Sequence, residues 1–226
     1  MKKIIYFIEF LLVEFLFIIC KVIGYKSASN LGFFIGKNFG NFFRKKKSII
    51  ENLHKSKIVI NTSDNQFVNN VLGNYGRILA EYPFLKDFRK NKLEQFIRID
   101  GIENLDKIKS NKKPVVFISG HFNNFELMAM QIEKHGINLA AIYRPLNNIF
   151  LNKTMERIRT KYICRNQIRK GRSGTRQILE NLKKGNSIAL MIDQRVTEGI
   201  KIDFFGNLAS TTTIPAQIIK KYECDL

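Results

Sequence analysis

The sequence predicts an α/β fold, in which a mixed, largely parallel sheet is flanked by helices, with an N-terminal membrane helix. Short apolar runs alternate along the chain with longer segments whose apolar residues recur at helical spacing. Strands that alternate with helices form parallel sheets, so this order favours an α/β domain. A mostly apolar segment covers residues 4–23, before any of these elements.

The expected elements divide the chain into three regions. The candidate strands cover residues 96–100, 114–119, 138–144, 187–193 and 200–205. The candidate helices cover residues 66–84, 123–135, 148–162, 173–184 and 213–222. We therefore expect a membrane anchor over 1–25, a helical, membrane-proximal region over 26–95, and an α/β core over 96–226.

The N-terminal segment is long enough to cross a bilayer but is interrupted by charge. Twenty helical residues span about 30 Å of hydrocarbon. Glu9 and Glu14 interrupt the segment, and each costs a few kcal/mol near the bilayer centre. A helix that lies in the membrane interface is the alternative. The cations that follow, among them 44-RKKK-47, favour a cytoplasmic location for the rest of the chain.

The segment 31-LGFFIGKNFGNFFRKKK-47 combines bulky apolar residues with a cationic end. One interpretation is an interfacial helix whose cations meet anionic lipid head groups. The other is a buried amphipathic helix followed by a solvated run of charge. The sequence does not decide between them.

Composition narrows the classes of partner. The chain has 226 residues, 45% of them hydrophobic, and a formal net charge of +19. Such a charge favours nucleic acid, anionic lipid, a phosphorylated substrate or an acidic protein, although much of the lysine excess is equally explained as solvated surface. The three cysteines and three histidines are scattered, which predicts no metal site and fits a reducing compartment.

The polar residues directly after the candidate strands are the first place to look for chemistry. In open parallel sheets, ligands bind beyond the carboxyl ends of the strands. The stretches at these positions are 120-GHFNN-124, 144-RPLNN-148 and 193-DQR-195.

His121 and Glu126 form a pattern that is weak by itself and gains weight from its context of strand, glycine, turn and helix. His121 follows a strand through Gly120, and Glu126 lies in the first turn of the next helix. A carboxylate that holds an imidazole makes it a good general base, for example toward an alcohol that attacks an acyl group. No serine or cysteine adjoins the pair, which favours direct transfer over a covalent intermediate. The alternative is structural, since Asn123 and Glu126 also fit a helix capping box.

Four ordered motifs resemble a known family. They are 119-SGHFNNFE-126, 143-YRPLNN-148, 192-IDQR-195 and 204-FFGNLASTTT-213. Together they resemble the late acyltransferases of lipid A biosynthesis, the lauroyl and myristoyl transferases of the wider H-x4-D/E lysophospholipid acyltransferase group. The resemblance covers roughly residues 1–226 and implies a glycerolipid-acyltransferase-like fold.

By this resemblance, the chain transfers a fatty acyl group from acyl carrier protein to a hydroxyl of a lipid A precursor. The acyl carrier protein thioester is the donor, and no further cofactor is implied. His121 would be the base and Glu126 its partner. The resemblance also implies substrate-binding roles for five residues, namely Arg144, Asp193, Gly206, Thr211 and Thr212. It places the enzyme at the bacterial inner membrane, with the catalytic domain on the cytoplasmic face and anionic lipids as partners.

Two alternatives stay open at this point, and a third is disfavoured. The acceptor could be a lysophospholipid or another glycolipid, because the H-x4-E pattern is common to these chemistries. Members of the family usually continue beyond the threonine motif, so we expect the C-terminal part of the fold to be missing, and an inactive remnant is an alternative. Charge alone motivates a nucleic-acid-binding protein, but the sequence has no zinc-finger or RNP-type motif, so we expect no nucleic-acid partner.

Overall fold

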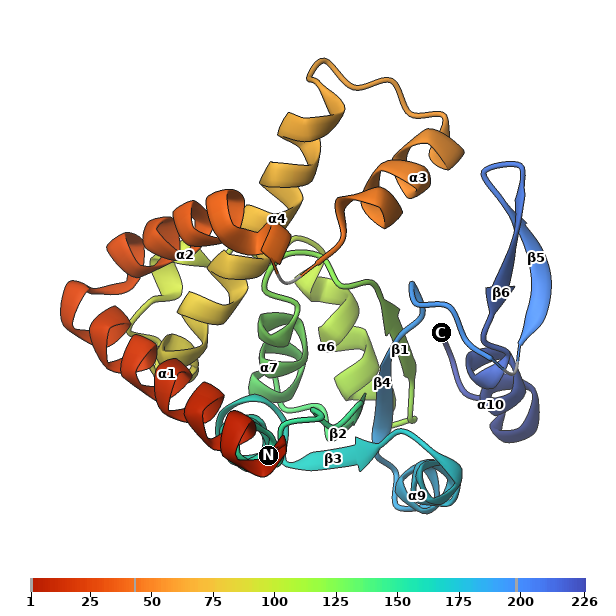
Figure 1. The fold of residues 1–226 in the computed structure, drawn as a ribbon. Coiled ribbons are helices and arrows are strands. Elements are labelled where there is room, and N and C mark those ends of the chain that lie inside the picture. The colour runs from red at the N-terminus through yellow and green to blue at the C-terminus, as the bar shows by residue number, and fades with distance from the viewer. Residues whose placement is uncertain (1, 43, 198) are drawn as a thin grey trace. The chain divides into compact units, whose positions relative to one another are not determined.

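The computed structural model describes residues 2–42, 44–197 and 199–226, without the side chain of Arg172 (Figure 1). The chain divides into two compact units. Unit 1 contains residues 2–10, 85–194 and 212–226, and unit 2 contains residues 11–84 and 195–211.

Unit 1 is built on a four-stranded sheet. Its strands are β1 (Val116–Ser119), β2 (Leu139–Tyr143), β3 (Asn166–Arg169) and β4 (Ser187–Met191), in the spatial order β1-β4-β2-β3. All three ladders of this sheet are parallel. The predicted α/β fold with a largely parallel sheet is therefore confirmed.

Helices flank this sheet. They are α5 (Leu85–Arg89), η3 (Glu94–Phe96), α6 (Ile102–Asn111), α7 (Glu126–Lys134), α8 (Ile149–Ile158), the π-helix η4 (Arg159–Ile163), α9 (Arg172–Lys183) and α10 (Ile214–Tyr222). Ile178 and Leu182 of α9 and Ile218 of α10 join one buried cluster with strand residues such as Val116 and Ile188. This core fixes the strands whose carboxyl ends carry the candidate site.

One strand prediction in this unit was wrong, and one strand was missed. The predicted strand over residues 96–100 does not form, because Phe96 ends η3 and residues 97–100 have no strand to pair with among the described residues. Arg98 pairs with Asp100 at the surface. Strand β3 was missed because it is an edge strand that pairs only with β2 among the described residues. Ile168 is its one buried residue, so it has no apolar run to detect.

Unit 2 is mainly helical. It contains α1 (Lys2–Ile23) from residue 11 onward, α2 (Tyr25–Phe39), η1 (Gly40–Phe42), α3 (Lys46–Ser56), α4 (Asp64–Glu81), η2 (Tyr82–Phe84) and the antiparallel strands β5 (Ile200–Phe204) and β6 (Asn207–Thr211). Helices α2 and α4 approach closely at glycines. A Cβ built on Gly76 would lie 2.1 Å from the carbonyl oxygen of Gly32, so a larger residue there would push the helices apart.

The predicted N-terminal membrane-spanning helix has no support in the structure. The segment 4–23 does lie within one helix, α1. Across the described residues, however, no helix is both long enough and apolar enough to span a bilayer. Glu9 and Glu14 interrupt the apolar residues of α1, and Lys2, Lys3 and Lys21 flank them. Glu9 also has a partner within unit 1, because the Asn148 side-chain amide donates to its carboxylate at 2.9 Å.

Candidate active site

The register of β1 and β4 brings two strand ends together. These strands are neighbours in the sheet, and Ser119 at the end of β1 lies opposite Met191 at the end of β4. His121 comes two residues after Ser119, and Asp193 comes two residues after Met191. Two side chains that are 72 positions apart in the sequence therefore meet at the carboxyl edge of the sheet.

Asp193 holds His121 through both of its carboxylate oxygens. The imidazole Nδ1 lies 2.7 Å from Oδ1, and the backbone N–H of His121 donates to Oδ2 at 2.8 Å. Because a carboxylate only accepts, this contact places the ring proton on Nδ1 and leaves Nε2 with its lone pair. The His121 side chain is 27% exposed, and the side-chain amide of Gln194 lies 3.4 Å from Nε2.

The environment of Asp193 favours its ionised form. Partial burial acts to raise its pKa, but hydrogen bonds from the backbone and imidazole of His121 outweigh that effect. The net result is a pKa below the usual range of an aspartate. An ionised Asp193 would stabilise the imidazolium that forms when His121 accepts a proton.

The turn between His121 and α7 contains neither the predicted helix start at residue 123 nor the predicted capping box. Helix α7 begins at Glu126, with Phe125 at its N-cap position and no side-chain cap. Asn123 adopts a left-handed conformation with φ 41°, which is incompatible with the predicted helix start there. The capping box of Asn123 and Glu126 is therefore absent. The Phe125 ring instead packs edge-on against the His121 ring, with 4.8 Å between centroids.

Glu126 forms an ion pair with Arg159. Its carboxylate Oε1 accepts hydrogen bonds from Nε and Nη2 of Arg159 at 2.8 and 2.6 Å. Glu126 is buried, and the Arg159 side chain is only 15% exposed. The structure thus shows two pairs here, His121–Asp193 and Glu126–Arg159.

Arg159 is the first residue of the π-helix η4 and connects Glu126 to a wider polar network. Its guanidinium lies over the Tyr143 ring, 5.7 Å from the centroid. The Tyr143 hydroxyl donates to Glu156, which also pairs with Arg169. Burial and the Glu156 carboxylate raise the pKa of Tyr143, so its hydroxyl stays protonated as a donor.

The other predicted site residues have different surroundings. Arg144 directly follows β2, the strand next to β4, and is exposed at the same edge as His121 and Asp193. Gly206 and Thr211 belong to the β5–β6 hairpin in unit 2, where Gly206 occupies the turn with φ 71°. Thr212 belongs to unit 1, and its hydroxyl accepts from the backbone N–H of Ile214 at 3.3 Å. Of the predicted residues, the described contacts join only His121 and Asp193 directly.

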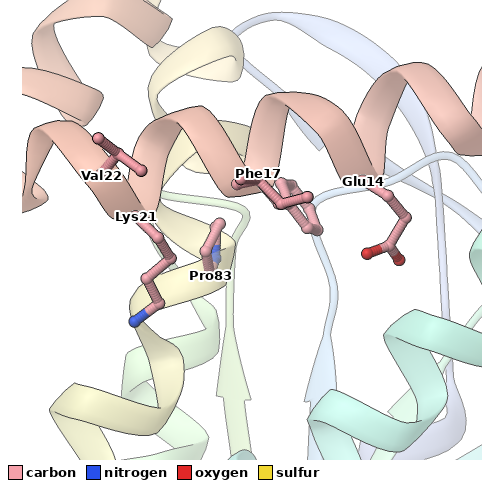
Figure 2. A pocket seen from close by; sticks show the side chains of 6 residues that line it. Glu14, Phe17, Lys21, Val22 and Pro83 are labelled. Carbon is pink, nitrogen blue, oxygen red and sulfur yellow. The ribbon is translucent and has the colours of Figure 1, made fainter.

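A pocket of about 370 Å³ lies in unit 2, along α1 and η2 (Figure 2). Its lining residues are Glu14, Phe17, Ile18, Lys21, Val22 and Pro83. In Figure 2 the Glu14 carboxylate and the Lys21 amine extend from the same side of α1, with Phe17 between them. None of these residues belongs to unit 1.

The described side chains offer no cluster of three or more His, Cys, Asp or Glu that could hold a metal ion. The sequence profile of the family described as bacterial lipid A biosynthesis acyltransferase matches residues 1–226. The chain belongs to this family. It is therefore an acyltransferase of lipid A biosynthesis, as the ordered motifs predicted. Among curated proteins, none matches the sequence.

For this acyltransferase, the sequence analysis did not identify the structural roles of Arg159 and Asn148. Arg159 lies inside a predicted helix, where an arginine is usually solvated, and only the fold shows that it meets Glu126. Asn148 stood in the stretch 144–148, but it is a helix cap. Its Oδ1 accepts from the backbone N–H groups of Phe150 and Leu151 at 3.1 and 3.2 Å. The signal that could have identified this role is the position of Asn148, an asparagine at the first residue of the candidate helix 148–162.

Proposed function

We propose that this acyltransferase moves a fatty acyl chain from acyl carrier protein to a hydroxyl of a lipid A precursor, with His121 as general base and Asp193 as its carboxylate partner. The observation that carries this proposal is the His121–Asp193 contact, which holds the imidazole through Nδ1 and leaves Nε2 to accept a proton. The site lies at the sheet edge where parallel α/β folds bind ligands.

In the proposed reaction, Nε2 of His121 removes the proton from the acceptor hydroxyl. The hydroxyl oxygen then attacks the carbonyl carbon of the acyl thioester, and a tetrahedral intermediate forms. When the C–S bond breaks, the imidazolium returns its proton to the departing thiolate. An ester and a free thiol result, and no covalent acyl-enzyme is needed.

Glu126 acts in this proposal as a positioning residue. Its buried ion pair with Arg159 fixes the first turn of α7, which directly follows the loop that carries His121. Removal of the pair would displace that loop, and a small displacement of a general base is sufficient to slow a reaction.

Arg144 is the residue proposed to meet a phosphate of the acceptor. It is exposed at the same sheet edge, and no ion-pair partner for it exists in the described part of the chain. An arginine fork matches the geometry of phosphate oxygens. Gly206, Thr211 and Thr212 are proposed as substrate-binding on the resemblance of their motif alone.

The proposed location is the cytoplasmic face of the bacterial inner membrane, with anionic lipids and the acidic acyl carrier protein as partners. The net charge of +19 supports both associations, because opposite charge attracts each of these partners to the enzyme.

The test is acyl transfer by membranes that contain this chain, with mixed acyl carrier protein thioesters as donors and a tetra-acylated lipid A precursor as acceptor. We expect His121→Ala to lower kcat about 10²–10⁴-fold, the usual contribution of a general base. Circular dichroism of the variant checks that the fold is retained. Full activity of the variant would contradict the mechanism. A lysophospholipid tested in parallel would show whether the acceptor, rather than the chemistry, is wrong.

A further inference from the structure

Two turns of unit 2 lie side by side and form one surface. The Asn207 side-chain amide, beside the β5–β6 turn, donates to the backbone carbonyl of Lys55 at 3.1 Å. A Cβ built on Gly206 would lie 3.6 Å from the ammonium of Lys57. Figure 1 likewise shows the end of α3 beside the turn between β5 and β6. We call residues 55–59 and 204–208 the tip.

The tip exposes large apolar side chains from both turns. Val59 is 91% exposed, Leu208 72% and Phe204 63%, and Ile58 and Phe205 are also exposed. Scattered single apolar residues are normal on a protein surface, but a cluster from two separate turns marks an interaction site.

The tip also carries positive charge. Lys55 and Lys57 are exposed, as is Lys201 in the adjoining strand β5. The nearby carboxylate of Asp203 is used within the turn, where it accepts from the backbone N–H of Gly206 at 3.1 Å. The tip therefore combines exposed apolar groups with lysines.

The hairpin turn places a bulky aromatic residue in a left-handed backbone conformation. Phe204 pairs with Asn207, so Phe205 and Gly206 form the two-residue turn, with φ values of 54° and 71°. Turns of this kind favour asparagine or glycine in both positions, and a bulky aromatic residue is rare there. Yet the Phe205 side chain is exposed, and its ring packs against the ring of Phe204, which is also exposed, with 4.7 Å between centroids.

We propose that the tip inserts its apolar side chains into the surface of an anionic lipid bilayer, with Lys55 and Lys57 against the head groups. Loops that carry apolar groups beside lysines suit such an interface, since hydrocarbon takes the apolar groups and anionic lipids attract the cations. An acidic protein partner would match the lysines but not this number of protruding apolar groups. The proposed insertion rests on the membrane location given in the proposed function, for which it names the contacting surface, but it does not depend on the proposed acyl transfer.

The direct test places an environment-sensitive fluorophore at the tip. Val59→Cys and Leu208→Cys would be labelled separately, with Ser110→Cys on α6 as an exposed control in unit 1. The three natural cysteines are buried, and burial raises the pKa of each thiol, for Cys164 to about 11, so they should react slowly. Vesicles of phosphatidylglycerol and phosphatidylethanolamine are the probe.

We expect a blue shift at positions 59 and 208, quenching there by spin-labelled lipid, and neither effect at position 110. Neutral phosphatidylcholine vesicles should give a weaker response. Vesicle binding without a shift at 59 and 208 would overturn the proposal and assign the contact to another surface. Absence of vesicle binding would also overturn it. If the fluorophore at positions 59 and 208 shifts to the blue with an acidic protein such as acyl carrier protein, but not with vesicles, the tip binds protein and the proposal is wrong.

A matched variant separates lipid contact from folding. Phe205→Asn removes an apolar ring and places the preferred residue in the turn, so the fold should be at least as stable. Vesicle affinity should fall about tenfold, the factor that corresponds to burial of one large apolar side chain. Unchanged vesicle affinity of a stably folded Phe205→Asn protein would contradict insertion of this side chain.

Discussion

The two carboxylate pairs of unit 1 begin close together in sequence, at His121 and Glu126, but differ in their surroundings. The His121–Asp193 pair is partly open, with side chains 27% and 39% exposed, and joins the ends of two strands. The Glu126–Arg159 pair is nearly closed off, at 8% and 15%, and joins the start of α7 to the π-helix η4. A substrate can reach a partly open pair, whereas a nearly buried pair mainly stabilises the fold.

Because of this difference, removal of one partner should have different effects on stability and activity in the two pairs. A partly open pair of this kind contributes little to stability, so Asp193 should matter more to the proposed chemistry than to the fold. A buried ion pair becomes costly when one partner is removed, because the remaining charge is left without compensation. We therefore expect substitutions in the His121–Asp193 pair to lower activity more than stability, and substitutions in the Glu126–Arg159 pair to lower stability more.

The largest expected effect on stability is that of Arg159→Met. It leaves the Glu126 carboxylate buried without its guanidinium, which should lower the free energy of unfolding by about 3–5 kcal/mol. Chemical denaturation measures this directly. Arg169→Met is the matched control, since Arg169 pairs with Glu156 at the surface and should change stability little. Equal effects of the two substitutions would remove the distinction between the two regions.

Glu126→Gln should have a smaller effect. Glutamine keeps an oxygen that can accept from Arg159 but loses the charge of the pair, at a cost of about 1–3 kcal/mol. Thermal unfolding of this variant beside Arg159→Met gives the comparison. A loss larger than that of Arg159→Met would mean that the buried charge is not what makes the pair important.

The smallest expected effect is a change in acid stability at Asp193. Its folded-state pKa lies below the ordinary 3.8, so its ionised form is stabilised by folding. That contribution is fully present above about pH 3.8 and is lost as the pH falls through the lower folded-state value. Unfolding of wild type and Asp193→Asn, compared across this range, should show their difference shrink toward low pH. A difference that grows with acidification would contradict the direction of the shift.

The sequence predicted where these side chains lie better than how they pair. Apolar runs placed His121, Arg144 and Asp193 after strands, and the structure keeps all three at the carboxyl edge of the sheet. The pairing depends on β1 and β4 being neighbours, a contact between distant segments that apolar periodicity does not encode. Local spacing suggested Glu126 as the partner because only local distances can be judged from a sequence.

The elements that prediction missed have weak local signals for physical reasons. Edge strand β3 buries a single side chain, and residues 97–100 have strand-like alternation without a neighbouring strand to pair with. Arg159 belongs to a π-turn that continues directly from α8, so its sequence does not differ from that of an ordinary helix. In each of these cases, contacts between residues distant in the sequence determine the local structure.

The most direct test of the account is kcat for acyl transfer by Asp193→Asn and Glu126→Gln, each measured where denaturation shows the protein folded. The asparagine side chain in the first variant would keep a hydrogen-bond acceptor but could not stabilise the imidazolium of His121. We therefore predict a large loss of kcat for Asp193→Asn and a clearly smaller loss for folded Glu126→Gln. The reverse order, with kcat lost at Glu126 and retained at Asp193, would contradict the assignment of Asp193 as the partner of His121.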